Sequence, residues 1–197
     1  MKKLLLTGFE PFLQFTLNPT EEVIKALNGE EIGAYQIVGK LLPVEFAEAQ
    51  QQIRQLLIDE KPDAVIALGL AGGRSKITPE RIAINVMDGA KDNSGHTPTD
   101  EAIALDGADG YFSTLPIREM VNRLTAAGYP AAISNTAGTY VCNLLMYTLL
   151  YETKGSIPAG FIHIPASHQL AIEHGKVPSW SQTDLTMAIK LCIETLV

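Results

Sequence analysis

Short apolar runs alternate with segments of helical period along most of this chain. Such alternation is typical of βαβ units, in which helices cover both faces of a mostly parallel sheet. We therefore expect an α/β fold. The predicted strands are residues 3–7, 35–41, 64–68, 77–86, 131–134 and 160–164.

The ends of the intervening helices can also be predicted. Asn18-Pro19-Thr20-Glu21 has an N-cap residue, Pro at the first helical position and Glu at the capping-box position. A second helix ends before Pro62, a third stops at Gly128, and the last begins at Ser181. The second, third and last helices each have an apolar face. The three faces are, in order, Phe46, Ala49, Ile53, Leu56 and Leu57; Ile117, Met120, Val121 and Leu124; and Leu185, Ala188, Ile189, Cys192, Ile193 and Leu196. We interpret Cys192, on the last face, as a packing residue without chemistry.

The length and charge of the chain limit what it does. With 197 residues it is long enough for one α/β domain with a full core, so residues 1–197 are expected to form a single domain. Its net charge of −7 argues against binding to nucleic acid, and no apolar run is long enough to cross a membrane. Two distant cysteines fit a reducing cytoplasm without disulfides. The polar segment 88–110 is expected to be a long loop, either functional or mobile.

Cys142 is the residue best placed for chemistry. Residues 138–143, Gly-Thr-Tyr-Val-Cys-Asn, place it in the first turn of a helix, where unpaired N–H groups favour an anion. We therefore expect its thiol to titrate below the free value of about 8.5, and the thiolate is the reactive form. The alternative is a small core residue, because free cysteine is often buried.

Glu80 and His163 supply the groups that a nucleophilic thiol requires. A thiol needs a base to take its proton, and the base needs a third group that fixes its tautomer. Both residues are predicted near the carboxyl ends of strands, where α/β sheets place ligand sites. Taken alone, Glu80 is compatible with a surface carboxylate, and His163 with a neutral core histidine. The other histidines lie in polar segments, and no His/Cys cluster has zinc spacing, so no metal is expected.

These segments resemble the type I pyroglutamyl peptidases, or pyrrolidone-carboxylate peptidases, a family of cysteine peptidases. The resemblance runs almost from end to end. Glu-Arg-Ile-Ala-Ile-Asn at residues 80–85 and Val-Cys-Asn at residues 141–143 are highly specific in combination. The other matching segments are residues 7–12, 18–20, 69–79, 136–140 and 160–165.

The resemblance implies a three-layer α/β/α sandwich with a mostly parallel twisted sheet, and a catalytic domain that removes N-terminal pyroglutamyl residues from peptides. It implies that Cys142 is the nucleophile, forming a thioester acyl-enzyme, that His163 is the general base and then acid, and that Glu80 orients His163. It implies no cofactor, a cytoplasmic location and a homotetramer.

Pyroglutamate is a lactam without a charged amino group, so its pocket needs apolar walls, a hydrogen-bond donor and an acceptor. The resemblance assigns Phe9 and Phe12 to the ring, and Val141 to the substrate site. Backbone groups around Leu70 and Ala71 are expected to bind the lactam amide. Backbone N–H groups at the start of the Cys142 helix are the expected oxyanion donors.

The chain departs from the family pattern outside the three catalytic positions. Family members usually have Phe-Gly-Gly where this chain has Phe12-Leu13-Gln14, and Gln is common at the position of Leu70. The segment after Met87 is shorter, and Lys91 is the counterpart of a basic residue near the active site. These changes affect the expected pocket.

Two alternatives remain open. The glycine-rich segment 69–74 is compatible with a phosphorylase-like enzyme on a similar scaffold, although it lacks the P-loop and dinucleotide patterns. The changes near Phe12 are compatible with a pyroglutamyl-binding homologue whose catalysis is weakened or lost.

Overall fold

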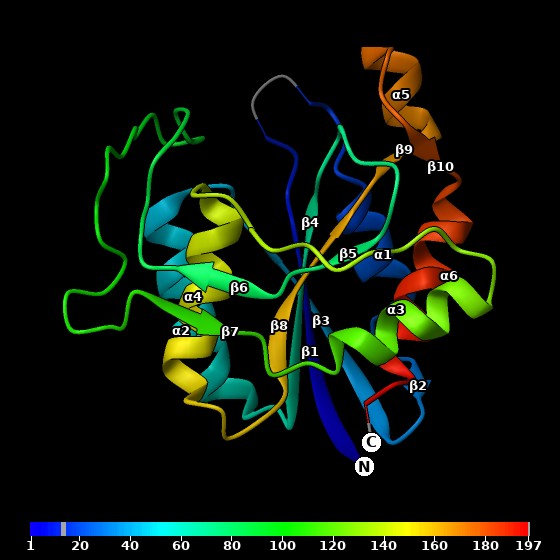
Figure 1. Cartoon of the computed structure of the whole chain (residues 1–197), viewed down its shortest axis with the longest axis horizontal. Helices are drawn as coiled ribbons and strands as arrows, with labels where there is room; N and C mark the ends of the chain where they lie inside the picture. Colours follow the sequence, from blue (N-terminus) through cyan, green and yellow to red (C-terminus); the bar gives the residue numbers. More distant parts are fainter. Residues whose placement is uncertain (13–14, 197) are drawn as a thin grey trace.

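The computed structural model describes residues 1–12 and 15–196 (Figure 1). Its main sheet has the strand order β2-β3-β1-β4-β8-β5. The four central strands run parallel, and the two edge strands run antiparallel to their neighbours. The central strands are β3 (Tyr35–Leu42), β1 (Lys2–Phe9), β4 (Ala64–Leu70) and β8 (Ala159–Ile164), and the edges are β2 (Glu31–Ile32) and β5 (Thr78–Pro79). The predicted α/β class with a mostly parallel sheet is confirmed.

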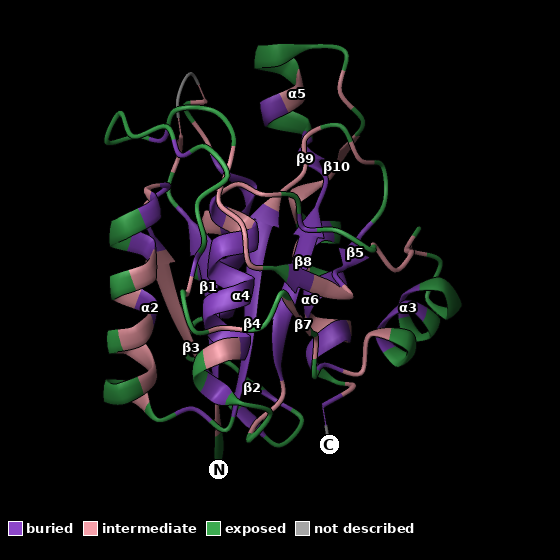
Figure 2. Cartoon of the chain, turned by 60° about the vertical axis from the view of Figure 1, so that its left-hand side comes forward, coloured by how far each residue is buried: buried purple, intermediate pink, exposed green. Residues whose placement is uncertain are grey.

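Helices cover both faces of the sheet, which gives three layers (Figures 1 and 2). One face packs against α1 (Pro19–Leu27), α3 (Ile117–Ala126) and α6 (Gln182–Ile193). The other packs against α2 (Phe46–Glu60) and α4 (Val141–Thr153). Two predicted helix caps are present, because the side chains of Asn18 and Ser181 accept hydrogen bonds from the N–H groups of Thr20 and Asp184.

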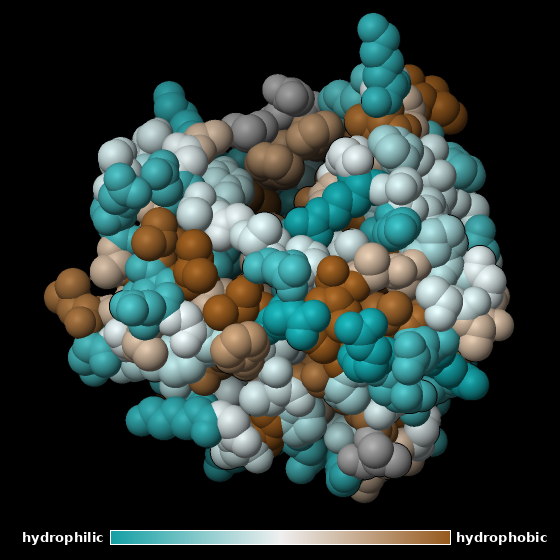
Figure 3. Space-filling model, viewed as in Figure 1, coloured by the Kyte–Doolittle hydropathy of each residue, from teal (hydrophilic) through white to brown (hydrophobic). Residues whose placement is uncertain are grey.

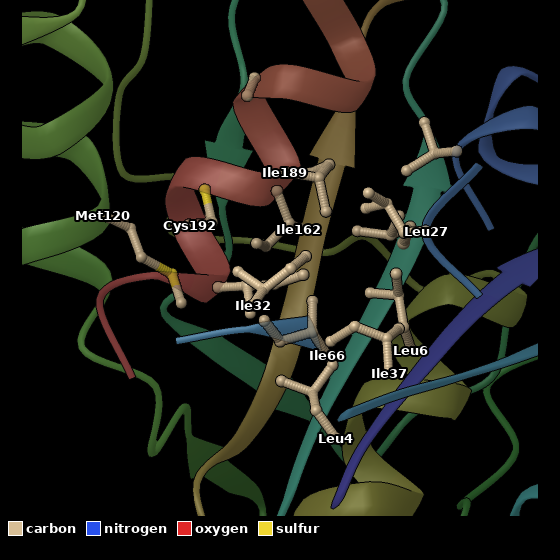
Figure 4. Packing of buried hydrophobic residues seen from close by; sticks show 14 of the residues in the cluster. Leu4, Leu6, Leu27, Ile32, Ile37, Ile66, Met120, Ile162, Ile189 and Cys192 are labelled. Carbon is tan, nitrogen blue, oxygen red and sulfur yellow. The ribbon is translucent and has the colours of Figure 1, made fainter. Parts of the chain in front are cut away.

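Alternation along β8 decides which residues face which helices. Ile162 belongs to the core on the α6 side, where Figure 4 shows it near Cys192 and Met120. Phe161 belongs to the core on the α4 side. Because neighbouring side chains on a strand point to opposite faces, His163 also points toward α4. Cys192 is fully buried on α6, as the sequence predicted.

Helix α4 is buried on almost all sides, and Figure 2 shows it largely in the buried colour. It lies between the sheet, helix α2 and a small antiparallel pair, β6 (Ile82–Ile84) and β7 (Gly110–Phe112). Since apolar residues surround this helix, it lacks the amphipathic stripe of the surface helices. Its N-terminus is therefore held on several sides.

Two predictions about secondary structure were wrong. Residues 77–86 do not form one strand, because the chain leaves the main sheet after Pro79 and begins β6 at Ile82. Residues 131–134 make only the isolated bridges of Ala131 and Ser134. The polar segment after β8, for which no secondary structure was predicted, holds α5 (His168–His174) between β9 (Ala166–Ser167) and β10 (Ser179–Trp180).

The Leu13 and Gln14 substitutions lie outside the described residues. Among the residues described, no helix has the length and apolar character that spanning a membrane requires.

Candidate active site

Glu80 and His163 form a buried pair at the carboxyl end of β8. The His163 Nδ1 atom lies 2.7 Å from Glu80 Oε1, and the Glu80 side chain is 0 % exposed. Glu80 reaches this position because its N–H donates to the carbonyl of Phe161 as the chain turns away from β5. Thr78 pairs with His163 across the antiparallel β5–β8 ladder, and Glu80, two residues further on, points to the same face of the sheet, so its carboxylate meets the imidazole.

The ionisation of this pair is asymmetric. Burial by itself raises the pKa of Glu80, but the hydrogen bond and charge of His163, with smaller effects of Ser134 and Arg74, bring it below its ordinary value. Burial lowers the pKa of His163, and the Glu80 bond does not fully offset this effect. The resting pair is an ionised carboxylate and a neutral imidazole. Its Nδ1 then carries the proton that Glu80 accepts, which leaves Nε2 as a base.

Cys142 lies on the same side of the sheet as His163. It occupies the first turn of α4, as predicted. A Cβ placed on Gly69 would lie 3.0 Å from Cys142 Sγ, and Gly69 is the partner of His163 in the β4–β8 register. A glycine at position 69 therefore leaves space for the sulfur. No hydrogen bond joins the thiol to the imidazole within the described part of the chain.

The expected low pKa of the Cys142 thiol was wrong. Burial, and then the negative charge of Glu80, raise the pKa of Cys142 to about 12, against a smaller opposing effect of Arg74. The residue as a whole is partly exposed, but its sulfur points inward beside Gly69. The helix N-terminus thus does not produce a resting thiolate. The thiol is protonated at neutral pH, and a base must remove its proton during the reaction.

Asn143 anchors the tip of α4 to the segment that follows Glu80. Its side-chain oxygen accepts from the Ile84 N–H at 3.0 Å. Its side-chain nitrogen donates to the carbonyls of Ile84 and Val86 at 2.9 and 3.0 Å. We did not predict this role, although a polar residue directly after Cys142 in an apolar helix was a signal for it.

The first turn of α4 offers donors for an oxyanion. The first backbone bond within this helix is donated by Leu144 to the Tyr140 carbonyl, and no side chain caps the N-terminus. The N–H groups of Val141, Cys142 and Asn143 therefore have no partner within the helix. They lie in the turn that carries Cys142, and their role as oxyanion donors stays a prediction.

Aromatic residues line one side of the nucleophile. Phe9 and Val141 are packed in the core. Because Phe9 is only 3 % exposed, its ring offers almost no surface to a substrate in this structure. The Phe12 ring is partly exposed and lies 6.3 Å from the Tyr140 ring, centroid to centroid. Tyr140 was not predicted, although an aromatic residue two positions before Cys142 was visible in the sequence.

The polar loop that follows β6 is hydrogen-bonded to Tyr140 and to the start of α2. The Tyr140 hydroxyl donates to the Lys91 carbonyl at 3.1 Å, and the Lys91 side chain is exposed. Asp92 is buried and accepts hydrogen bonds from the N–H groups of Phe46, at the start of α2, and of His96. These bonds hold the loop against both α2 and the residues before α4.

Leu70 and Ala71 lie at the end of β4, beside a cavity of about 110 Å³. The cavity is lined by Phe12, Phe15, Leu70, Gly72, Ala166, Leu170, His174 and Val177, and Figure 3 shows the surface hollowed at this end of the sheet. The Ala71 N–H already donates to the Ile164 carbonyl at 2.9 Å, and the Ala71 carbonyl accepts from Arg74 N–H. The Ala71 N–H is thus engaged, which leaves Leu70 as the better candidate to donate to a lactam. A larger hollow of about 560 Å³ lies beside α1 and α6, and the described lining of neither space includes Cys142, His163 or Glu80.

No group of three or more His, Cys, Asp or Glu residues able to hold a metal ion occurs among residues 1–12 and 15–196. The site consists of a thiol, an imidazole and a carboxylate.

Known proteins resemble this chain over almost its whole length. The sequence model of the pyroglutamyl peptidase family matches residues 2–197. The chain belongs to the pyroglutamyl peptidase family. It is therefore a peptidase, and the phosphorylase-like alternative has no support from these comparisons.

Relatives within the pyroglutamyl peptidase family span the whole chain. It is 55% identical to the pyrrolidone-carboxylate peptidase of Lysinibacillus sphaericus, covering 100% of this chain and 98% of the relative. It is 51% identical to that of Oceanobacillus iheyensis, covering 100% of both chains. The crystal structure of pyroglutamyl peptidase I from Bacillus amyloliquefaciens is similar with a TM-score of 0.95 and 41% identity, over 99% of this chain and 96% of the other. The predicted family and sandwich fold are confirmed.

Proposed function

We propose that this protein hydrolyses the amide bond after an N-terminal pyroglutamyl residue, through Cys142, His163 and Glu80. The observation that carries the proposal is the buried Glu80–His163 pair on the face of the sheet that also holds the Cys142 sulfur. Relatives over the full length of the chain bear the name pyrrolidone-carboxylate peptidase, which supports the same substrate.

In the first half of the reaction, neutral His163 removes the thiol proton as sulfur attacks the pyroglutamyl carbonyl carbon. A carbon–sulfur bond forms, and the carbonyl oxygen becomes an oxyanion held by N–H groups at the start of α4. Protonated His163, stabilised by Glu80, then gives its proton to the departing peptide amine. The carbon–nitrogen bond breaks, which leaves a thioester.

In the second half, His163 takes a proton from water as the water oxygen attacks the thioester carbonyl. The carbon–sulfur bond breaks, the thiolate regains the proton from His163, and free pyroglutamate leaves. Because the resting thiol is neutral, the reaction begins without an ion pair. The hydrogen bond between sulfur and imidazole then belongs to the substrate complex, since catalytic hydrogen bonds often tighten only there.

Selectivity for pyroglutamate follows from a pocket that offers no carboxylate for an ammonium group. Phe12 and Tyr140 are proposed to provide apolar surface for the ring, and Val141 is packed in the core directly before the nucleophile. The backbone of Leu70 is proposed to bind the lactam amide. An analogue without the lactam carbonyl would leave such a group unpaired, which costs about 1–3 kcal/mol.

The test is release of a fluorogenic amine from its pyroglutamyl amide, compared with the prolyl amide that lacks the lactam carbonyl. Cys142→Ala should abolish turnover, and Cys192→Ala should preserve it because Cys192 lies in the core. Iodoacetamide should inactivate both the wild type and Cys192→Ala. Turnover by Cys142→Ala would refute the mechanism, and binding of the pyroglutamyl amide without turnover by the wild type would favour the weakened homologue.

We also propose, from the family resemblance, a single catalytic domain, a homotetramer and a cytoplasmic location. Two unpaired cysteines support a reducing compartment. Light scattering coupled to gel filtration tests the tetramer, and a monomer mass of 21.3 kDa would contradict it.

A further inference from the structure

Arg74 contacts both groups that hold His163 in place. Its guanidinium Nη1 lies 2.6 Å from Glu80 Oε1, the same oxygen that bonds the His163 ring. The same nitrogen donates to the Thr78 hydroxyl at 2.7 Å. Thr78 in turn donates to the His163 carbonyl at 3.4 Å. Arg74, Glu80, His163 and Thr78 therefore form a closed ring of polar contacts around the histidine.

Arg74 also reaches the segment that leads to the nucleophile. Its Nη2 donates to the Thr136 carbonyl at 3.3 Å, in the loop before α4. Its own backbone is fixed by a turn in which Arg74 N–H donates to the Ala71 carbonyl. One guanidinium therefore links the loop after β4, the Thr78–Glu80 segment and the approach to Cys142.

The planar fork of arginine suits this position. Glu80 is fully buried, whereas the Arg74 side chain is 33 % exposed. The carboxylate Oε1 accepts two short bonds, and Oε2 accepts none from the described residues. Arg74 and His163 therefore hold the same carboxylate oxygen, Oε1. A lysine would bring a point charge without the fork.

We propose that Arg74 is a positioning residue, which fixes the Glu80 carboxylate so that His163 presents Nε2 to the Cys142 thiol. This inference rests on the proposed function, because it assigns His163 the task of a base. Arg74 does not touch the substrate carbonyl or the sulfur in this role. It acts through Glu80 and Thr78.

The charge of Arg74 gives the proposal a measurable signature. The described charges that bear on the pKa of His163 are Glu80, which raises it, and Arg74, which lowers it. Arg74 also lowers the pKa of Glu80 and of Cys142. Removing this cation should therefore raise the pKa values of His163, Glu80 and Cys142. His163 then becomes protonated at higher pH, and the Cys142 thiol ionises less readily.

The test compares Arg74→Met and Arg74→Lys in a Cys192→Ala background. Arg81→Met is the matched control, because the Arg81 side chain bonds Asn135 at 2.7 Å and not Glu80. Arg74→Met should lower kcat on the order of tenfold to a hundredfold, as loss of an orienting partner typically does, with a smaller change in KM. It should also move the acid limb of the kcat/KM profile to higher pH. Arg74→Lys should keep the wild-type acid limb and recover part of kcat, and Arg81→Met should match the wild type.

A second readout does not depend on the substrate. The rate of Cys142 alkylation by iodoacetamide at fixed pH should fall in Arg74→Met and stay unchanged in Arg81→Met. If the wild type does not cleave pyroglutamyl amides, the proposed function fails, while the alkylation rates still test the effect of Arg74 on the thiol. An unchanged kcat and acid limb in Arg74→Met would overturn the inference. Equal loss of activity in Arg74→Met and Arg74→Lys, with lowered melting temperatures and no shift of the limb, would also overturn it, since that result shows a structural role only.

Discussion

His163 Nδ1 and Glu80 Oε1 lie 2.7 Å apart, although 83 positions separate the two residues in the sequence. Both side chains are buried, so the pair is shielded from water and holds one tautomer of the imidazole.

Replacing Glu80 by Gln should keep the shape of this contact and remove its charge. The amide can then donate to Nδ1, which would place the histidine proton on Nε2, where it cannot act as a base. We expect kcat to fall by about 10²- to 10⁴-fold, by analogy with the loss seen when the carboxylate of a catalytic triad becomes an amide. Steady-state kinetics with the exposed Glu119→Gln as control would measure it, and a loss below tenfold would contradict the role of Glu80.

The pH dependence of alkylation should show a protonated resting thiol. With a Cys142 pKa of about 12, the thiolate fraction rises about tenfold for each pH unit below that value. Iodoacetamide rates measured in the Cys192→Ala background should therefore climb from pH 7 to 10 without a plateau. A plateau reached below pH 8 would show instead a resting thiolate.

Catalysis should fail on the acid side only below the ordinary pKa of histidine. Burial keeps the pKa of His163 below about 6.5, so the neutral base persists at that pH and is lost as the pH falls further. The pKa of Glu80 is also lowered. Its ionised form therefore stabilises the fold, and this stabilisation is lost as the pH falls through that pKa. The kcat/KM profile of the wild type gives this limb directly, and an acid limb above pH 7 would contradict a neutral resting imidazole.

Gly69→Ala should disturb the nucleophile more than the rest of the fold. The added Cβ would lie 3.0 Å from Cys142 Sγ and 2.6 Å from the Phe161 ring, so sulfur and ring must shift. A displacement near 1 Å at a reacting group can cost on the order of a hundredfold in rate. Overpacking should also destabilise the fold by about 1–3 kcal/mol.

The matched variant for this prediction is Gly73→Ala. A Cβ at Gly73 meets nothing within 4 Å, so its kcat and urea midpoint should equal those of the wild type. Equal kinetics for Gly69→Ala and Gly73→Ala would show that the glycine at position 69 does not set the position of the sulfur.

Asn143→Ala should destabilise the protein and lower its activity. The change leaves the Ile84 N–H and the carbonyls of Ile84 and Val86 without their side-chain partner. The Ile84 carbonyl keeps its bond from the Val86 N–H, whereas the part-buried Ile84 N–H and Val86 carbonyl lose a partner, and a buried polar group left unpaired costs about 1–3 kcal/mol. Urea unfolding should therefore show a loss of at least that size, whereas Asn122→Ala, on the exposed side of α3, should change stability little. Stability equal to that of Asn122→Ala would contradict the anchoring role.

The sequence by itself determined the alternation of the four central strands with the main helices, several helix ends and the place of Cys142 at a helix tip. These features depend on residues a few positions apart. Asn18 caps α1 through Thr20, Ser181 caps α6 through Asp184, and the stripe that buries Cys192 repeats within one helix.

Only the tertiary structure decided the ionisation and the contacts of the site. The helix tip alone predicted a low thiol pKa, but burial and the charge of Glu80 raise it, and both arise from distant parts of the chain. Glu80 faces His163 because β5 pairs with β8 in the main sheet, and the pattern within either segment alone does not reveal that pairing. The ring of contacts through Arg74 forms only when the loop after β4, the Thr78–Glu80 segment and β8 meet at one end of the sheet. Local signals depend on near neighbours, whereas burial and charge depend on everything that the fold brings together.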